Sequence, residues 1–368
     1  MSEAFQIGPV AVEVSGRSRT ADVVRRVLAA APPANGPVQL RFEFRDALEG
    51  PPIEGSCQTR PGGFAARDRL FDYQVSWSAP PASPAVTVAV APRSKPLPSR
   101  LADRAREAWK YWRKFAASGR LHFPRRFLFY VYMPMLELTL LERRSTLVHC
   151  SAIEKNGRAI LFPAVGGVGK TSIMCRYVAD GWRYLADDMC VLAPDGAVAV
   201  HPLPMHVYGY HKHGNPELVA KVRSTATAMD RLLWTFWCAA AGEDQVVRWV
   251  PAERVFGRDR MADTGQVAKV VFLRRCEADA FSLHEAGPEE LSRAIVESTL
   301  AELNDLPRIC RGLAGAAPGV PLEDQLAGRM HQACLAGLSR SAGYIVDVPA
   351  PAGPNELRRF LDERGVVA

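Results

Sequence analysis

Apolar and polar residues alternate in four segments of the first 97 residues, and this pattern predicts β-strands. The segments are FQIGPVAVEV, VQLRFEFRD, DYQVSWS and AVTVAVAP. Alternation with β-branched residues is typical of strands that bury one face. Further on, apolar residues recur at steps of three and four from Leu101 to Phe115, which predicts a helix. We therefore expect residues 1–122 to form a smaller β-rich domain with a trailing helix of basic and aromatic residues.

Residues 123–368 show a different pattern, in which predicted strands alternate with predicted helices. The segment STLVHCSAIEKNGRAILFPA reads as two strands around an Asn156-Gly157 turn. A helix is predicted next at Lys170–Ala179, followed by a strand at RYLA and a strand pair around the turn at Asp195-Gly196. The remaining predicted elements are, in order, the strand QVAKVVFL, the helices PEELSRAIVESTLAEL and EDQLAGRMHQACLAGL, the strand YIVDVP and the helix NELRRFLDE. Alternation of this kind predicts an α/β fold for the larger C-terminal domain.

The most apolar run, FLFYVYMPMLELTLL, predicts a buried helix and no membrane span. It contains Pro134 and Glu137 and is shorter than the roughly 20 residues that a span requires. The net charge of +7 is compatible with nucleotide ligands but too small to argue for nucleic acid. The eight cysteines are scattered without a C-x-x-C pair, and the first residues show no signal-peptide pattern. Together these features predict a cytoplasmic protein with reduced thiols.

The stretch FPAVGGVGKTSI has the order of a phosphate-binding loop, or Walker A motif. Glycines let a loop point backbone N–H groups at phosphate oxygens, a lysine reaches the β- and γ-phosphates, and the next hydroxyl ligates Mg²⁺. The flanking segments are a predicted strand and a predicted helix, as the motif requires. The sequence therefore predicts an ATP and Mg²⁺ site. Its nucleotide-binding residues are Ala164, Val165, Gly166, Gly167, Val168, Gly169, Lys170, Thr171 and Ser172.

One position departs from the motif, because Ala164 stands where the pattern has its first glycine. Alanine is tolerated there if the local φ is negative, and two glycines follow at Gly166 and Gly167. The alternative is a glycine-rich turn that starts a helix and binds no nucleotide.

Two adjacent carboxylates follow the strand RYLA. Asp187 and Asp188 stand at the end of this strand, just after the helix of the loop. One carboxylate can hold Mg²⁺ and the other can accept the proton of an attacking hydroxyl. The alternative is an ordinary turn. His149 precedes the loop in an apolar strand. It is a candidate neighbour of the γ-phosphate, and the alternative is a buried histidine with a purely structural role.

The run from Leu147 to Leu192, LVHCSAIEKNGRAILFPAVGGVGKTSIMCRYVADGWRYLADDMCVL, resembles the core of the HPr kinase/phosphorylase-like family. The resemblance implies that Lys170 and the loop bind ATP and that Thr171 and Asp188 hold the metal. It also implies catalytic roles for Asp187 as the base, for Lys170, and for His149 as a polar neighbour of the phosphates. It does not extend to residues 1–120.

The segment AVHPLPMHVYGYHKHGNPE lacks the glutamate-isoleucine-arginine-glycine signature of true HPr kinases, so HPr is not the expected acceptor. The chain instead resembles divergent relatives such as lasso-peptide kinases, whose acceptors are a peptide serine or a small-molecule hydroxyl. Four histidines in this segment suggest either a metal site or, as we favour, a polar loop over the active site. They are His201, His206, His211 and His213.

The leading hypothesis is an ATP-dependent kinase acting on a hydroxyl of a peptide, protein or small molecule. The alternative is a nucleotide-dependent regulatory or partner-binding module with little turnover, and a third hypothesis is chemistry of the phosphoenolpyruvate carboxykinase type. Arg274 and Arg275 are further candidates for contacting phosphate charge. The sequence is compatible with a homo-oligomer and leaves the acceptor open.

Overall fold

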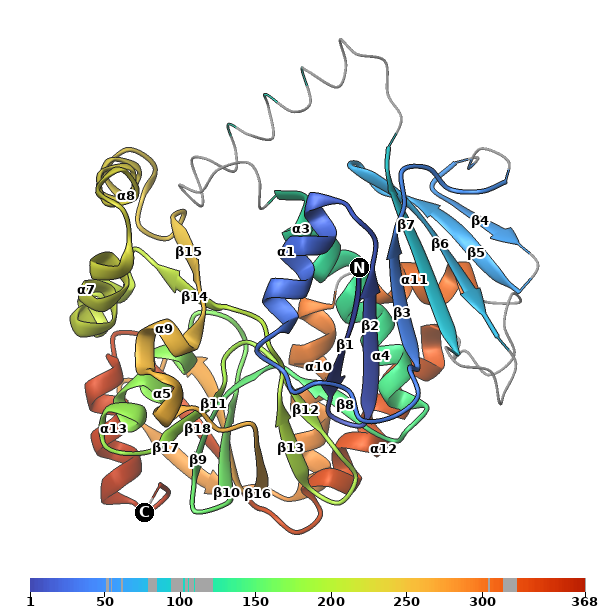
Figure 1. Ribbon diagram of the computed structural model, residues 1–368. Helices are drawn as coiled ribbons and strands as arrows, with labels where there is room; N and C mark the ends of the chain where they lie inside the picture. Colours follow the sequence, from blue (N-terminus) through green and yellow to red (C-terminus); the bar gives the residue numbers. More distant parts are fainter. Residues whose placement is uncertain are drawn as a thin grey trace. The chain divides into compact units, whose positions relative to one another are not determined.

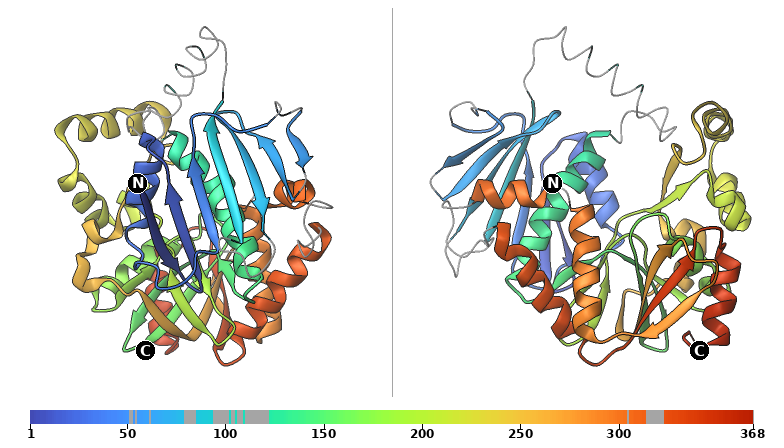
Figure 2. Two further views of the ribbon diagram at one scale, coloured as in Figure 1. Left: turned by 45° about the vertical axis from the view of Figure 1, so that its right-hand side comes forward. Right: turned by 180° about the vertical axis from the view of Figure 1, so that it is seen from behind.

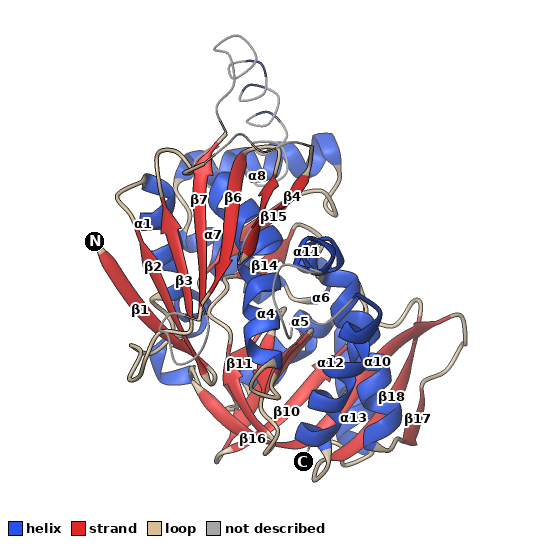
Figure 3. Ribbon diagram, turned by 90° about the vertical axis from the view of Figure 1, so that its right-hand side faces the viewer, coloured by secondary structure: helices blue, strands red, loops and turns tan. Residues whose placement is uncertain are grey.

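The computed structural model describes residues 1–50, 53, 55–60, 62–78, 85–93, 102, 105, 109, 122–303, 305–313 and 323–367. Most of the helix predicted from Leu101 to Phe115 lies outside these residues. The fold is mixed α/β with several sheets (Figure 1 and Figure 3). The chain forms two compact units, and each unit is made of three separate stretches of sequence. The sequence had instead predicted two domains with a single boundary at residue 122. The first compact unit comprises 1–107, 120–146 and 300–332, and the second 108–119, 147–299 and 333–368.

The first unit is built on a seven-stranded sheet with the order β1-β2-β3-β7-β6-β5-β4. Its central strands β2, β3 and β7 run parallel, and the pairs toward both edges are antiparallel. The four alternating segments of the sequence all form strands here, as predicted. The strands are β1 (Ser2–Ile7), β2 (Val10–Ser15), β3 (Leu40–Phe44), β4 (Cys57–Arg60), β5 (Gly63–Arg67), β6 (Phe71–Trp77) and β7 (Val86–Pro92).

Helices cover one face of this sheet (Figure 2). They are α1 (Arg19–Leu28), α3 (His122–Phe127), the π-helical turn η2 (Leu128–Tyr132), α4 (Met133–Leu141) and α11 (Leu306–Leu313). All nine residues of α4 are buried, which confirms the predicted buried helix. No helix in the described part of the chain is long and apolar enough to cross a membrane. Helix α1, which begins after the N-cap Ser18, was not predicted from the sequence.

The second sheet has the order β11-β9-β10-β16-β13-β12-β8, with β18 beside β16 and β17 beside β18. The long strand β16 runs parallel to both β10 and β18. Helices α5 and α13 pack against each other and against the core of this unit (Figure 1). The elements are β8 (Thr146–Val148), β9 (Cys150–Lys155), β10 (Arg158–Pro163), α5 (Lys170–Ala179), β11 (Arg183–Ala186), β12 (Cys190–Leu192), β13 (Ala197–Val200), β16 (Thr264–Cys276), β17 (Ser282–Glu285), β18 (Ala342–Pro349) and α13 (Pro354–Glu363).

The remaining elements connect these strands. The predicted helices α10 (Pro288–Glu302) and α12 (Glu323–Leu338) are present. The region after β13 contains a two-stranded sheet and short helices that the sequence did not predict. They are β14 (Met205–Tyr208), α6 (His211–Gly214), α7 (Pro216–Thr225), α8 (Ala228–Ala241), β15 (Val247–Val250), α9 (Ala252–Phe256) and the 3-10 turn η3 (Arg258–Arg260).

Strand directions bring the predicted site residues to one end of the second sheet. Strands β9 and β10 form the predicted hairpin, and Asn156 and Gly157 at its turn have φ of 55° and 79°. Because β9 is antiparallel to both neighbours, the start of β9 lies beside the ends of β10 and β11. The loop after β10, His149 before β9, and the aspartates after β11 therefore converge.

Candidate functional site

The loop between β10 and α5 has the backbone of an anion-binding turn. Gly169 caps α5 in a left-handed conformation with φ of 105°, and Gly167 has φ of 82°. The first amide groups of any helix lack an intrahelical acceptor, and no N-cap side chain bonds to those of α5. A methyl group added at Gly166, Gly167 or Gly169 would meet nothing within 4 Å, which shows that the loop is open to its surroundings. Free amides at a helix N-terminus favour a negatively charged ligand.

Ala164 fits its position for a physical reason. Among the described non-glycine residues, only Arg144, Asn156 and Asp188 have positive φ, so Ala164 has no need of glycine's freedom. Its side chain is fully buried in the core of the second unit, and its backbone bridges to Leu273 of β16. The side chain of Ala164 therefore packs into the core, and the exposed part of the loop begins at the next residue, Val165.

Lys170 holds the start of α5 to its surroundings. Its Nζ donates to the carbonyl oxygen of Ala164 at 2.8 Å and lies 2.9 Å from Nε2 of His149. His149 is buried, and its backbone N–H donates to Oγ1 of Thr299 at 3.0 Å. The structure thus brings Lys170 and His149 into contact.

Asp187 is the buried acceptor at the centre of the site. Its Oδ1 accepts hydrogen bonds from Ser151 at 2.6 Å and from Thr171 at 2.9 Å. Burial raises the pKa of Asp187 to about 6, with a further rise from the charge of Asp188. The two hydroxyl groups and Lys170 oppose this rise. A carboxylate with a pKa near neutrality is suited to accept a proton during a reaction.

Asp188 lies in a strained backbone conformation with φ of 79°. Its two carboxylate oxygens lie 3.6 Å from Nε2 of His149 and 3.6 Å from Nδ1 of His206. Burial alone would raise the pKa of Asp188, but His149, His206 and Lys170 outweigh it and hold the pKa well below its usual range. The adjacent aspartates thus have opposite pKa shifts, which separates a proton acceptor from a permanent anion.

His206, one of the four histidines in the predicted loop, lies at this site beside Asp188, together with Trp249, which was not predicted. The indole N–H of Trp249 on β15 donates to Nε2 of His206 on β14 at 2.5 Å. The neutral ring therefore carries its proton on Nδ1, which faces Asp188. Ser151 was also missed. Its position opposite the end of β11 depends on strand pairing that the sequence does not reveal.

The other three histidines of the predicted cluster have different surroundings and different partners. His201 is buried, His211 accepts from the backbone N–H of Tyr208 at 3.3 Å, and His213 lies 2.7 Å from Glu243. Within the described ranges, no group of three or more His, Cys, Asp or Glu side chains is arranged to hold a metal. The oxygens of Thr171 and Asp188 remain the predicted metal ligands, and hard cations such as Mg²⁺ prefer oxygen.

The two candidate arginines point to different partners. Arg274 pairs with Asp347 at 2.6 Å, on β16 and β18. Arg275 donates to the carbonyl oxygen of Pro349 at 2.6 Å and reaches the carbonyl oxygen of Gly167 at 3.5 Å. Of the predicted loop residues, Val165, Gly166 and Gly167 are exposed, whereas the other loop residues are less exposed or buried. Arg275 is thus the arginine adjacent to the loop.

Comparisons with known proteins gave matches among solved structures alone. No family model matches the chain. No curated protein matches it either. Among solved structures, the chain is similar to the HPr(Ser) kinase/phosphatase from Coxiella burnetii, at 10% identity and a TM-score of 0.23. The match covers 38% of this chain and 71% of that one. A likeness this weak establishes neither the family nor the activity, so a functional proposal depends on the site itself.

Proposed function

We propose that this protein is an ATP-dependent kinase that transfers the γ-phosphate to a hydroxyl group, as a divergent member of the HPr kinase/phosphorylase-like family. One observation carries the proposal. The first turn of the loop helix and the buried Asp187 are joined by the hydrogen bond from Thr171 at 2.9 Å. A phosphate chain held by the loop amides would therefore end beside a carboxylate whose pKa is near neutrality.

The loop residues bind and orient the nucleotide. The amides from Gly166 to Thr171 and the ammonium of Lys170 hold the triphosphate by charge and hydrogen bonds. Lys170 exchanges its present contact with Ala164 for phosphate oxygens. Thr171 and Asp188 would hold Mg²⁺, which neutralises charge on the phosphate oxygens when bound. The low pKa of Asp188 supports this division, because a metal ligand must remain ionised.

Asp187 acts as the general base that accepts the proton of the acceptor hydroxyl. The acceptor oxygen forms a bond to the γ-phosphorus, the bond from that phosphorus to the β–γ bridging oxygen breaks, and ADP leaves. The hydroxyl proton passes to Asp187. Ser151 and Thr171 orient the Asp187 carboxylate, and its burial excludes water from it.

The acceptor is proposed to be a hydroxyl of a peptide, a protein or a small molecule other than HPr. The segment where HPr kinases carry their substrate signature here forms β14 and α6, with Tyr208 and Tyr210 stacked at 5.2 Å between ring centres. Tyr210 is 39% exposed, and the burial of the rest of its side chain raises its pKa to about 12, so its hydroxyl stays protonated and available as a donor. We propose that the protein acts in the cytoplasm.

The test separates binding from transfer. Titration calorimetry measures ATP affinity with Mg²⁺, and labelled ATP measures transfer to serine peptides and small polyols. We expect Asp187→Asn to lower transfer by at least about 100-fold while ATP affinity stays within about threefold of wild type. The exposed Asp195→Asn removes the same charge away from the site and is the matched control.

Two results would contradict the proposal. An unchanged transfer rate in Asp187→Asn would remove the assigned role of that residue, and absence of ATP binding by the wild type would remove the kinase altogether. Tight ATP binding with no transfer to any acceptor would favour the regulatory module instead.

A further inference from the structure

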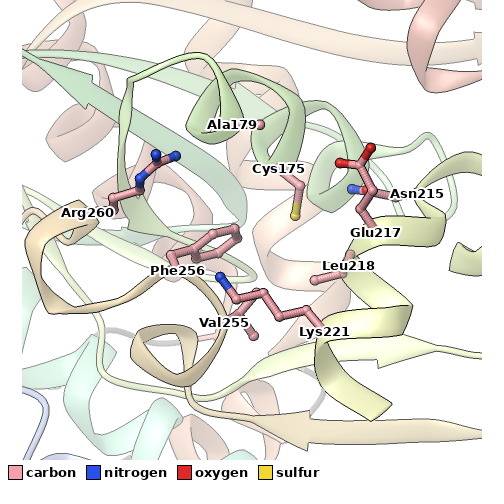
Figure 4. A pocket seen from close by; sticks show the side chains of 9 residues that line it. All are labelled: Cys175, Ala179, Asn215, Glu217, Leu218, Lys221, Val255, Phe256 and Arg260. Atoms are coloured by element: carbon pink, nitrogen blue, oxygen red, sulfur yellow. The ribbon is translucent and has the colours of Figure 1, made fainter. Parts of the chain in front are cut away.

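The second unit contains a pocket that the proposed reaction does not use. Its volume is about 400 Å³, within the range of pockets that bind small molecules. Helices α5, α7 and α9 and the turn η3 contribute its walls (Figure 4). The lining residues are Cys175, Ala179, Asn215, Glu217, Leu218, Lys221, Val255, Phe256 and Arg260.

The pocket has a buried floor and a charged rim. Leu218 and Val255 are buried, and Phe256 is half-buried and stacks on Tyr184 with 5.6 Å between ring centres. Lys221 and Arg260 are exposed. An apolar, partly aromatic floor below charged groups suits a ligand with a flat apolar body and a polar end.

Asn215 supplies a polar group to the floor. The residue is 3% exposed, and within the described part of the chain its Nδ2 bonds to no oxygen or nitrogen atom, while the thiol of Cys175 is a neighbouring weak acceptor. Figure 4 shows its amide nitrogen on the side of the Cys175 sulfur, which is a weak acceptor. Buried polar groups without a partner are rare in folded proteins because each costs free energy. An oxygen atom of a ligand in the pocket would satisfy this donor.

The charge of the rim favours an anion. Arg260 donates to the carbonyl oxygen of Val178 at 2.9 Å, and none of the ion pairs within the described ranges involves Lys221 or Arg260. Glu217 is the single carboxylate in the lining. Two cations against one carboxylate leave a net positive rim, which attracts negatively charged ligands.

The pocket is separate from the phosphate loop but shares a helix with it. Thr171, Cys175 and Ala179 recur at steps of four along α5 and so lie on one face of the helix. Thr171 belongs to the first turn, whereas Cys175 and Ala179 line the pocket one and two turns later, about 6 and 12 Å along the axis. A ligand in the pocket would therefore leave the loop amides free.

We propose that this pocket is a second ligand site, which binds a small organic anion with a flat apolar body. The body packs on Phe256 and Leu218, the anionic group lies between Lys221 and Arg260, and a further ligand oxygen accepts from Asn215.

The experiment uses 4-hydroxybenzoate as the probe, with saturation-transfer NMR to detect binding and calorimetry to measure the Kd. No nucleotide is added, so the result is independent of the proposed kinase activity. We expect 4-hydroxybenzoate to bind about tenfold more tightly than the neutral 4-hydroxybenzyl alcohol or the cationic 4-hydroxybenzylamine. Lys221→Gln and Arg260→Gln should each weaken binding about two- to fivefold.

Two variants sharpen the test. Ala179→Phe fills the pocket from an exposed position of α5 and should weaken binding more than about tenfold, with little change in melting temperature. Arg231→Gln removes an exposed cation of α8 outside the pocket and should leave the Kd unchanged. The proposal is overturned if the three probes bind equally, if no saturation transfer occurs at millimolar probe, or if Ala179→Phe binds like wild type.

Discussion

Replacing Ala164 by glycine would restore the usual first residue of the phosphate-binding motif. If the alanine were a defect, Ala164→Gly should tighten ATP binding. The structure leads to the opposite expectation, because Ala164 has no positive φ and its methyl group is fully buried in the core of the second unit. We therefore expect the change to lower stability without improving the site.

The magnitude follows from two contributions. Removing the buried methyl group of Ala164 costs about 0.8 kcal/mol of apolar burial. The added backbone freedom of glycine in the unfolded chain costs a further 0.5–1 kcal/mol or so. Together these give a loss of roughly 1–2 kcal/mol in the free energy of unfolding, or about 2–8 °C in melting temperature. The ATP affinity should stay within about twofold, because the affected methyl group points into the core.

Urea unfolding followed by circular dichroism measures the stability, and calorimetry with ATP and Mg²⁺ measures the affinity. Gly166→Ala is the matched control in the same loop. It has no positive φ, and its new methyl group would meet nothing within 4 Å. The stability of this control should be equal to or up to about 1 kcal/mol above that of wild type.

Two outcomes would refute this reasoning. Unchanged stability of Ala164→Gly would mean that the buried methyl group makes no contribution. A gain in ATP affinity of more than about threefold would mean that alanine restricts the loop after all.

Three further predictions concern the loop, a buried histidine and the positioning of a second histidine. Gly169→Ala should lower the free energy of unfolding measured in urea by about 1–2 kcal/mol, because the backbone φ of 105° is strained for alanine. The new methyl group itself would meet no atom within 4 Å. A variant as stable as the wild type would contradict this prediction. Burial lowers the pKa of His211 from 6.5 to about 4, so its protonation in the unfolded chain should reduce stability as pH falls below 6.5, by about 2 kcal/mol at pH 5. His211→Gln should lose less stability between pH 7 and pH 5, and an equal loss would refute this. Trp249→Phe should lower transfer about tenfold at unchanged ATP affinity, because His206 loses the donor that fixes its ring; an unchanged rate would show that this hydrogen bond has no role.

Much of the secondary structure was predictable because its signals are local. The Asn156-Gly157 turn, the helix Lys170–Ala179 and the strand Arg183–Ala186 form where the sequence predicted them. Each depends on turn chemistry, on apolar spacing or on glycines at helix ends. The helix Arg19–Leu28 was missed, because its ten residues interrupt a region dominated by alternating patterns.

The sequence by itself determined the loop, the paired aspartates and the hairpin before them, since these follow from neighbouring residues. Tertiary structure decided which groups meet. Antiparallel pairing of β9 with β10 and β11 places Ser151 on Asp187, and the β14–β15 pair places Trp249 on His206 beside Asp188. It also decided that the two aspartates differ, because burial and neighbouring charges shift their pKa values in opposite directions. Such contacts join residues far apart in the chain, so no local pattern records them.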